Sequence, residues 1–183
     1  DVNTPIDETM AALSTLKKQG KIRFVGVSNF SEKQIEDAQE YLQIDVQQPP
    51  FSMVNRNFVD LMKWGMERGI DSMTYGSQGS GILSGAIRTL PDFAPGDMRL
   101  TFYDFFREPK FSKLMELLKT MDQIAAKHGK PVAQIAINWS TAQDFVGTAL
   151  VGVRNEQEAI ENCAAFDWQL EDDEVALLNA ELE

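Results

Sequence analysis

The feature that most constrains the fold is a short apolar strand, predicted at residues 22–27, that directly follows a helix and ends in small polar residues. Gly20 stands between the two, and glycine is the usual residue after a last helical turn. Ser28 and Asn29 come directly after the strand. Ligands of α/β barrels bind at the carboxyl ends of the parallel strands, so these two side chains indicate a binding site rather than a core.

The rest of the chain repeats this alternation of helices and strands. Three more strands are predicted at residues 44–48, 70–75 and 146–151, and helical patterns separate them. Such an alternation indicates an α/β fold with a parallel sheet. Complete eight-stranded barrels of this class have about 250 residues, and about 200 at least. The 183 residues therefore suit a single domain, residues 1–183, that is smaller than a complete barrel.

Capping residues indicate where several helices begin. Thr4 is predicted to cap the first helix, with Pro5 at the first helical position. Ser31 and Gln34 have the spacing of a capping box, in which each side chain binds the backbone N–H of the other residue. Asn155 is predicted to cap a helix near the C-terminus.

Residues 86–110 have neither a helical nor a strand period. They contain three prolines and five aromatic residues, namely Phe93, Phe102, Tyr103, Phe105 and Phe106. Long irregular loops inside compact domains are uncommon, and many of them are lids or binding loops. We therefore expect this segment to be a lid or a binding loop.

Charge and composition argue against several classes of function. The formal net charge is −11 and no Lys or Arg follows Arg154, which argues against nucleic acid and anionic membrane surfaces as partners. No apolar run is long enough to span a bilayer. Cys163 is the only cysteine and His128 the only histidine, so neither an internal disulfide nor a metal site is expected. A chain without disulfides suits a reducing compartment, and we expect it to be cytoplasmic.

A turn rich in glycine and serine, residues 76–81, follows the third predicted strand. Backbone N–H groups in such a turn can surround a phosphate, although a turn of this composition is as often a plain connection. Its spacing differs from that of the Rossmann fingerprint. Tyr75 stands at the end of the third predicted strand, just before the turn. Asn29 and Gln48 likewise stand at the ends of the first and second predicted strands. An aromatic ring beside carboxamide groups suits a nicotinamide.

Arg154 lies just before the helix that Asn155 begins. A guanidinium at a helix N-terminus can bind a phosphate through paired hydrogen bonds, with help from the helix dipole. The commoner role of a single arginine is that of a solvated surface residue. Glu161 and Asn162, on the same helix, can contact the edge of a purine or can simply be solvated.

The chain closely resembles the aldo/keto reductase family over essentially its whole length. The resemblance is carried by motifs in the same order and spacing, namely Thr4-Pro5, the run Gly26-Val27-Ser28-Asn29-Phe30, Gln48 before Pro49, Tyr75, Asp97-Met98-Arg99, Pro131-Val132-Ala133-Gln134 with Trp139, and Gly152-Val153-Arg154 with Glu161-Asn162. Members of this family are NADP-dependent carbonyl reductases on a TIM barrel, and they include an auxiliary subunit of a potassium channel. The resemblance implies an α/β half barrel, the last four strands of a TIM-type (β/α)8 barrel.

The resemblance also implies a binding site for NADP. The nicotinamide carboxamide and ring would contact residues at strand ends, namely Ser28, Asn29, Gln48 and Tyr75. The pyrophosphate would lie along the glycine-rich turn, namely Gly76, Ser77, Gln78, Gly79 and Ser80. Arg99 would lie on the loop that folds over the cofactor. The adenosine and its 2′-phosphate would be surrounded by Gly152, Arg154, Glu158, Glu161 and Asn162.

The catalytic Asp, Tyr, Lys and His of the family lie on the first four strands of its barrel, before residue 1 of this chain. The chain begins with Asp1 rather than Met, so we expect a piece of a longer translation product. His128 stands at a helix end, where a structural role is expected. No residue of this chain is therefore predicted to be catalytic. The resemblance implies an NADP-dependent reductase of carbonyl compounds, represented by its cofactor-binding half and inactive alone.

Two alternatives to this function stay open. The chain can be a non-catalytic interaction or assembly module that keeps the reductase scaffold, or a remnant without activity. In the complete protein, the expected partners are NADPH and a small carbonyl substrate. Four parallel strands cannot close a barrel and leave unpaired edges, so we also expect a homodimer or a complex with the complementary half. The alternative to both is a monomer in which residues 86–110 cover the exposed face of the sheet.

Overall fold

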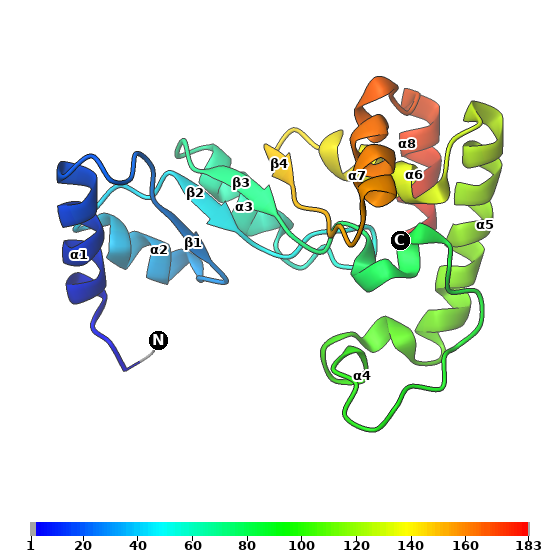
Figure 1. The fold of residues 1–183 in the computed structure, drawn as a ribbon, viewed down its shortest axis with the longest axis horizontal. Helices are drawn as coiled ribbons and strands as arrows, with labels where there is room; N and C mark the ends of the chain where they lie inside the picture. The colour runs from blue at the N-terminus through cyan, green and yellow to red at the C-terminus, as the bar shows by residue number, and fades with distance from the viewer. Residues whose placement is uncertain (1–2, 183) are drawn as a thin grey trace.

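The structure, a computed structural model, describes residues 3–182. At its centre is a parallel sheet of four strands in the order β1 (Gly26–Ser28), β2 (Val46–Gln48), β3 (Asp71–Thr74) and β4 (Thr148–Ala149). Each strand pairs with the next one along the chain. Helices precede, separate and follow the strands along the chain (Figure 1). The predicted α/β fold with a parallel sheet is confirmed.

All four strands are shorter than the apolar runs that predict them. In β1 the reason is visible, because the backbone N–H of Val25 donates to the Asp45 carboxylate at 2.8 Å rather than to a backbone carbonyl. The ladder begins only at Gly26, which pairs with Val46. The predicted limits of residues 22–27 are therefore wrong at the amino end and one residue short at the carboxyl end, where Ser28 pairs with Gln48, although the place of the strand is right. An apolar run marks burial, whereas a strand also needs a paired neighbour.

One face of the sheet is covered by helices. The strand residues that point to this face are buried, namely Val27, Gln47, Ser72 and Thr74. α1 (Ile6–Lys18) and α2 (Glu32–Gln39) share a small core with β1, to which they contribute Met10, Ile35 and Ala38. α3 (Val59–Met66) lies against β2, where Gln47 Nε2 donates to the Leu61 carbonyl at 3.3 Å.

The opposite face of the sheet is open. It carries the residues that alternate with the buried ones, and these are exposed or half-buried, namely Gly26, Ser28, Val46, Gln48, Asp71, Met73 and Thr148. Only Val46 and Met73 among them are apolar. The sheet is therefore packed on one side and accessible on the other.

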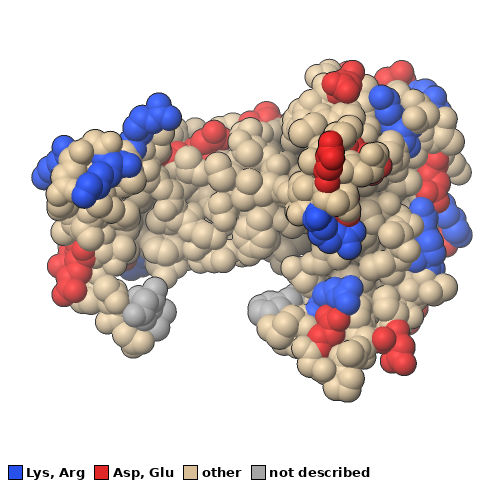
Figure 2. All heavy atoms as spheres, viewed as in Figure 1, with Lys and Arg blue, Asp and Glu red and all other residues tan. Residues whose placement is uncertain are grey.

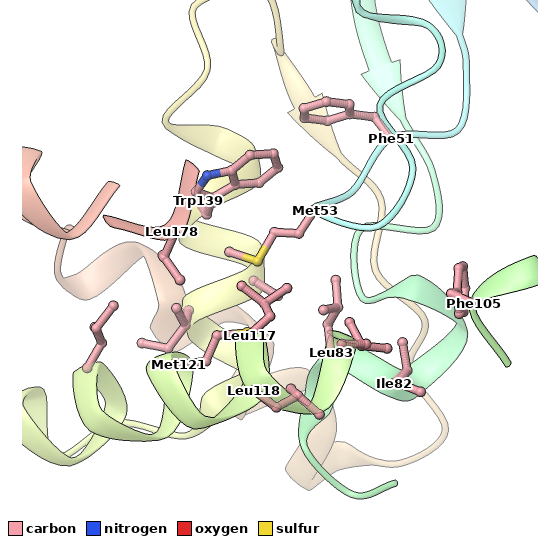
Figure 3. Close-up of a cluster of buried hydrophobic side chains, with 14 of the residues drawn as sticks. Phe51, Met53, Ile82, Leu83, Phe105, Leu117, Leu118, Met121, Trp139 and Leu178 are labelled. Atoms are coloured by element: carbon pink, nitrogen blue, oxygen red, sulfur yellow. The ribbon is translucent and has the colours of Figure 1, made fainter. Parts of the chain in front are cut away.

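A larger hydrophobic core lies beyond β3, between the sheet and the C-terminal helices (Figure 3). Three long helices build it, namely α5 (Lys110–His128), α6 (Val132–Thr141) and α8 (Asp172–Glu181). Two shorter helical segments follow β4, namely α7 (Glu156–Cys163) and η3 (Ala164–Asp167). Trp139 of α6 stacks on Phe51 with the ring centroids 5.5 Å apart, and its Nε1 donates to Asn179 Oδ1 at 2.9 Å. These contacts fasten α6 both to α8 and to the segment that follows β2.

Residues 86–110 are folded by their aromatic side chains. They contain the short helices α4 (Arg99–Phe102) and η2 (Asp104–Phe106), so the prediction of no regular structure is wrong here. Phe105 and Phe106 are buried in the larger core. Large aromatic side chains bury enough surface to order a segment that has no periodic pattern. The predicted function of the segment as a lid stays a prediction.

The helix ends follow the predicted capping residues with one exception. Ser31 and Gln34 form the capping box of α2, and the Asn155 side chain accepts a backbone N–H at the start of α7. α1 begins one residue later than predicted, with Pro5 rather than Thr4 as its N-cap and without a capping side chain. The reason is that Pro5 has an extended ψ of 140°, so helical geometry starts only after it.

None of the helices within residues 3–182 is both long and apolar enough to cross a membrane. In the same part of the chain, no three His, Cys, Asp or Glu side chains lie close enough together to hold a metal ion.

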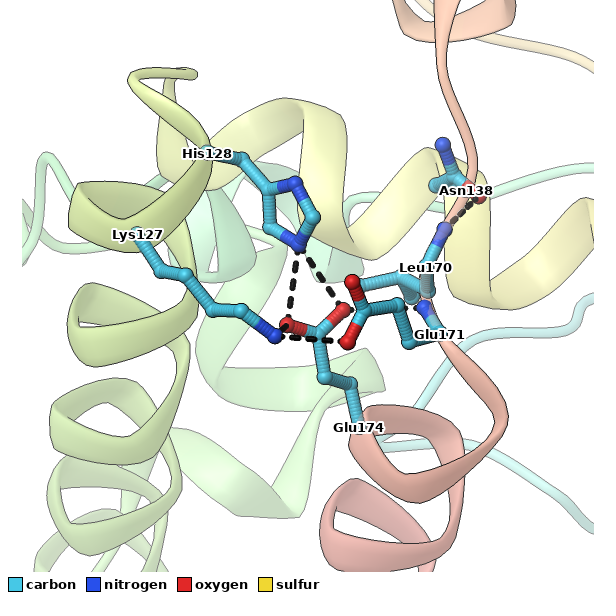
Figure 4. Close-up of polar contacts among 6 residues, drawn as sticks. All are labelled: Lys127, His128, Asn138, Leu170, Glu171 and Glu174. Carbon is cyan, nitrogen blue, oxygen red and sulfur yellow. Dashed lines mark hydrogen bonds and ion pairs between the residues drawn. The ribbon is translucent and has the colours of Figure 1, made fainter.

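A buried carboxylate fastens α8 to the end of α5 (Figure 4). The Glu174 side chain is only 5% exposed, accepts from Lys127 Nζ at 2.8 Å and lies 2.8 Å from His128 Nε2. It also accepts the backbone N–H of Glu171 at 2.9 Å. Burial raises the pKa of the Glu174 carboxyl, but the hydrogen bonds from these three groups outweigh burial and hold the pKa below its usual value. His128 thus has the structural role that was predicted for it.

We expect the change Glu174→Gln to lower the free energy of unfolding by about 1–3 kcal/mol at neutral pH, because it removes a charged acceptor from a buried site. Folding lowers the pKa of Glu174, so this contribution is present above the usual value of 4.5 and is lost as the pH falls through the folded-state value. Urea unfolding at neutral pH and in acid measures both effects. The control Glu116→Gln removes an exposed pair with Lys119 and should cost less than about 1 kcal/mol. Equal losses in the two variants would contradict the assignment.

Candidate functional site

Side chains from three strands meet at the carboxyl edge of the sheet. Ser28 Oγ, at the end of β1, donates to the carbonyl of Gln48, at the end of β2, at 3.0 Å. The Tyr75 hydroxyl, directly after β3, donates to Asn29 Oδ1 at 3.0 Å. The structure therefore brings together the four residues that were predicted to lie around a nicotinamide.

The two carboxamide groups at this edge are held in place by different means. Asn29 has a positive φ of 58°, a left-handed conformation that asparagine adopts more readily than most residues. The Gln48 side chain is half-buried, and its Nε2 contacts Met73 Sδ at 3.6 Å. Each carboxamide has both donor and acceptor atoms, so it can pair with a second carboxamide in either sense.

The glycine-rich turn after β3 is built from left-handed residues. Gly76, Gly79 and Ser80 have φ values of 73°, 54° and 54°, and the 3-10 helix η1 (Gly79–Ser84) begins inside the turn. A side chain at Gly79 would have no room, because its Cβ would lie 2.9 Å from Val54. Backbones of this kind can form concave sites for anions.

Hydrogen bonds tie this turn to the segment that follows β4. Ser77 Oγ donates to the Leu150 carbonyl at 3.3 Å. Gln78 Nε2 donates to Asn162 Oδ1 on α7 at 3.4 Å, and Asn162 Nδ2 donates to the Gly152 carbonyl at 3.2 Å. Hydrogen bonds therefore connect predicted site residues from the turn, the segment after β4 and α7.

Arg154 is held by Glu158 at the start of α7. Its Nε and Nη2 lie 3.0 Å and 2.6 Å from Glu158 Oε1, and its backbone N–H donates to Oε2 at 2.8 Å. The side-chain hydrogen bond lowers the pKa of Glu158 and raises that of Arg154, so both groups are charged at neutral pH. The Arg154 side chain is nevertheless 88% exposed, which leaves part of the guanidinium accessible to an anion.

Two predicted site residues lie outside these contacts. Arg99 pairs with Asp97 at 2.6 Å and lies over the Phe93 ring, 4.5 Å from its centroid. The hydrogen bond from Arg99 lowers the pKa of Asp97 to about 2. Glu161 is exposed and accepts from Gln157 at 2.7 Å. Their predicted contacts with a cofactor stay predictions.

A cavity of about 170 Å³ opens beside Tyr75, and it includes residues that the sequence pattern does not single out. Ser52 and Asn55 from the segment after β2 contribute to its wall, and so does Tyr103 from residues 86–110. One signal could have indicated the first two. Consecutive prolines end the second strand at the carboxyl edge, so the residues after them must lie near that edge.

A family model described as the Aldo/keto reductase family matches residues 1–183. The chain belongs to the aldo/keto reductase family.

Individual aldo/keto reductases match the chain over nearly all its length. The glycerol dehydrogenase AKR11B4 from Gluconobacter oxydans has a TM-score of 0.90 and 31% identity, and the match covers 100% of this chain and 55% of that one. The aldo-keto reductase YhdN from Bacillus subtilis is 28% identical over 100% of this chain and 56% of its own. The NADH-specific methylglyoxal reductase from Escherichia coli is 29% identical over 96% of this chain and 53% of its own. The chain thus spans about half the length of these relatives.

We expect the change Asn155→Ala to loosen α7, the helix that carries Glu158 and Asn162. Loss of an N-cap costs about 1 kcal/mol, and α7 has no buried residue that would compensate. Hydrogen exchange in α7 should therefore become about fivefold faster, the factor that corresponds to this free energy. The matched control is Ser31→Ala, which removes the cap of α2 and should accelerate exchange there instead. Unchanged exchange in α7 would show that the cap does not hold this part of the site.

Proposed function

We propose that this chain is the cofactor-binding part of an NADP-dependent aldo/keto reductase that reduces a small carbonyl compound. Membership of the family supports an oxidoreductase. The observation that carries the proposal is the meeting of Ser28, Asn29, Gln48 and Tyr75 at the carboxyl edge of the sheet, in continuity with Asn162 on α7.

The residues at the carboxyl edge have the chemistry that a nicotinamide requires. Asn29 and Gln48 offer carboxamide donors and acceptors, and Ser28 adds a hydroxyl beside them. Tyr75 offers a flat ring, whose orientation is held by its hydrogen bond to Asn29. We infer that these side chains orient the nicotinamide at the edge of the sheet. When bound, NADPH supplies the hydride for the reduction of the carbonyl group.

The remainder of the cofactor would lie along the turn after β3 and the start of α7. The turn from Gly76 to Ser80, with its left-handed residues Gly76, Gly79 and Ser80, suits the pyrophosphate. Arg154 and the N-terminus of α7 attract a phosphate, with Glu158 and Glu161 near the adenosine. Relatives carry names of both kinds, one NADH-specific and one, yakc of Schizosaccharomyces pombe, with NADP(+). We propose NADPH because its 2′-phosphate can pair with the exposed guanidinium of Arg154. NADH has no such phosphate and cannot make this contact.

Residues 86–110 are proposed to fold over this cofactor. Tyr103 and Phe105 from this segment line the cavity beside Tyr75, which supports this proposal. Arg99 would reach the cofactor from the same segment. Its pairing with Asp97 holds the guanidinium in one orientation before any ligand binds.

We also propose that the four strands are half of an eight-stranded barrel and that the chain alone does not reduce carbonyls. The open face of the sheet and its accessible edges support the half barrel. Two residues with proton-donating groups, among those that the structure describes, are engaged in other contacts. The Tyr75 hydroxyl donates to Asn29, and His128 is held by Glu174 at the end of α5.

Calorimetric titration of the purified chain tests the cofactor assignment. We expect NADPH to bind at least several-fold more tightly than NADH, since only NADPH has the 2′-phosphate that can pair with Arg154. The change Arg154→Ala should remove this preference and leave the affinity for NADH nearly unchanged. Arg68→Ala, an exposed arginine beyond α3, is the control and should affect neither affinity. Equal affinities for the two cofactors in the unchanged chain would contradict the assignment of Arg154.

The inactivity of the chain alone is tested by NADPH oxidation with 4-nitrobenzaldehyde. General acid catalysis is worth about a hundredfold to ten-thousandfold, and we expect no oxidation above background without it. Clear turnover by the mass-verified chain would show that a proton donor lies within these residues.

A non-catalytic assembly module is the second candidate, and the open face and edges of the sheet favour it. Such a module can bind a partner without binding a dinucleotide. If neither cofactor binds in the titration while the chain is folded, this second candidate replaces the first.

A further inference from the structure

The helix α7 carries Glu158, Glu161 and Asn162 of the candidate site, but apolar burial contributes little to its position. Each residue from Glu156 to Cys163 is exposed or half-buried, and Ile160, the only large apolar residue among them, is 56% exposed. Figure 2 shows Asp and Glu side chains at the surface over α7, in keeping with this exposure. Most helices are stabilised by packing of an apolar face, so α7 depends on polar contacts instead.

A buried glutamine of α6 provides such a contact. Gln134 is only 4% exposed, and its Nε2 donates to the Glu161 backbone carbonyl at 2.8 Å. The last carbonyls of a helix have no partner within the helix, so this bond satisfies a group at the end of α7. The Gln134 Oε1 accepts from the indole Nε1 of Trp168 at 3.0 Å. An indole N–H only donates and a carbonyl only accepts, so the carboxamide is held in a single orientation.

Asn138, one turn further along α6, holds the segment that follows α7. It is 5% exposed, and its Nδ2 donates to the carbonyls of Ala165 and Trp168 at 3.0 Å and 2.8 Å. Its Oδ1 accepts the backbone N–H of Leu170 at 3.2 Å (Figure 4). Residues four apart lie on one face of a helix, so Asn138 fixes the backbone of the same Trp168 whose indole donates to Gln134.

We propose that Gln134 is a positioning residue for the cofactor, because it holds the last turn of α7 and with it Glu161 and Asn162. Its role rests on the proposed function, which assigns these two residues to the adenosine end. Asn162 also accepts from Gln78 of the turn after β3 at 3.4 Å, so the anchor on α6 and the site meet at this helical turn. The Gln134 carboxamide is buried and both its ends are engaged, so it acts through α7.

The amino end of α7 is held by other residues. Asn155 caps it, and Arg154 pairs with Glu158 there. Loss of the Gln134 contact therefore affects the end of α7 that faces the adenosine, which NADPH and NADH share. It leaves the contact of Arg154 with a 2′-phosphate in place. The affinities for the two cofactors should consequently fall by the same factor.

Calorimetric titration of the variants Gln134→Glu and Gln134→Met tests this role. The first keeps an oxygen that accepts from Trp168 and loses the donor to α7, whereas the second loses both contacts. The net worth of one hydrogen bond corresponds to about twofold to tenfold in an equilibrium constant. We expect NADPH and NADH to bind more weakly by about this factor, with the ratio of their affinities unchanged. Hydrogen exchange in the last turn of α7 should rise by a similar factor.

The matched control is Asn179→Leu. It removes the acceptor of another buried side chain of α6, the indole of Trp139, but this contact joins α6 to α8 rather than to α7. The control should lower the stability of the chain and leave both cofactor affinities and hydrogen exchange in α7 unchanged. Circular dichroism checks that every variant is folded.

Folded Gln134 variants that bind both cofactors as tightly as the unchanged chain would overturn the positioning role and leave the proposed function standing. An equal loss of affinity in Asn179→Leu would also overturn it, because the effect would then be a general loss of stability, and so would unfolding of both Gln134 variants. If the unchanged chain binds neither cofactor, the proposed function fails, and the role of Gln134 fails with it whatever the exchange in α7.

Discussion

Backbone pairing between neighbouring parallel strands is the interaction on which the rest of this structure depends. Parallel strands need a crossover between them, so every strand returns to the same direction and all carboxyl ends meet at one edge. This is why Ser28 can reach the Gln48 carbonyl, and why the hydroxyl of Tyr75 can reach Asn29 from 46 residues away. The helices stabilise the sheet by burying one of its faces. The pairing of the strands fixes the positions of the polar side chains at their carboxyl ends.

The candidate site joins two parts of the molecule that have separate cores. β1 packs with α1 and α2 in the small core, whereas α5, α6 and α8 form the larger one. The turn after β3 connects them, because Ser77 and Gln78 bond to residues that follow β4. Trp139 and Glu174 lie outside the site. Trp139 joins α6 to α8 and Glu174 joins α8 to α5, and these helices support α7.

The same ladder that gathers the site also stops abruptly at both ends. A sheet of four parallel strands has no internal way to satisfy its outer strands, and helices cover only one of its faces. The place of the site and the open edges of the sheet therefore have one physical origin, the ladder of four parallel strands.

The sequence by itself determined the features that depend on neighbours in the chain. The place of each strand, the Ser31 capping box, the Asn155 cap and the polar residues after β1 all follow from patterns a few residues long. The resemblance of the motifs to a family added which residues would share one site, such as Asn29 and Tyr75 around a nicotinamide.

Only the tertiary structure decided the features whose partners lie far away in sequence. β1 begins only at Gly26 because the N–H of Val25 donates to the Asp45 carboxylate instead of a backbone carbonyl. Asp45 lies 20 residues further along the chain, so no local sequence pattern predicts this hydrogen bond. Phe106 is buried because α5 lies over it, although its own segment has no period. Glu174 could be predicted as an acid at a helix start, but its burial against Lys127 follows from the packing of α8 on α5. Local propensity acts over a few residues, whereas burial and pairing depend on what the fold brings alongside.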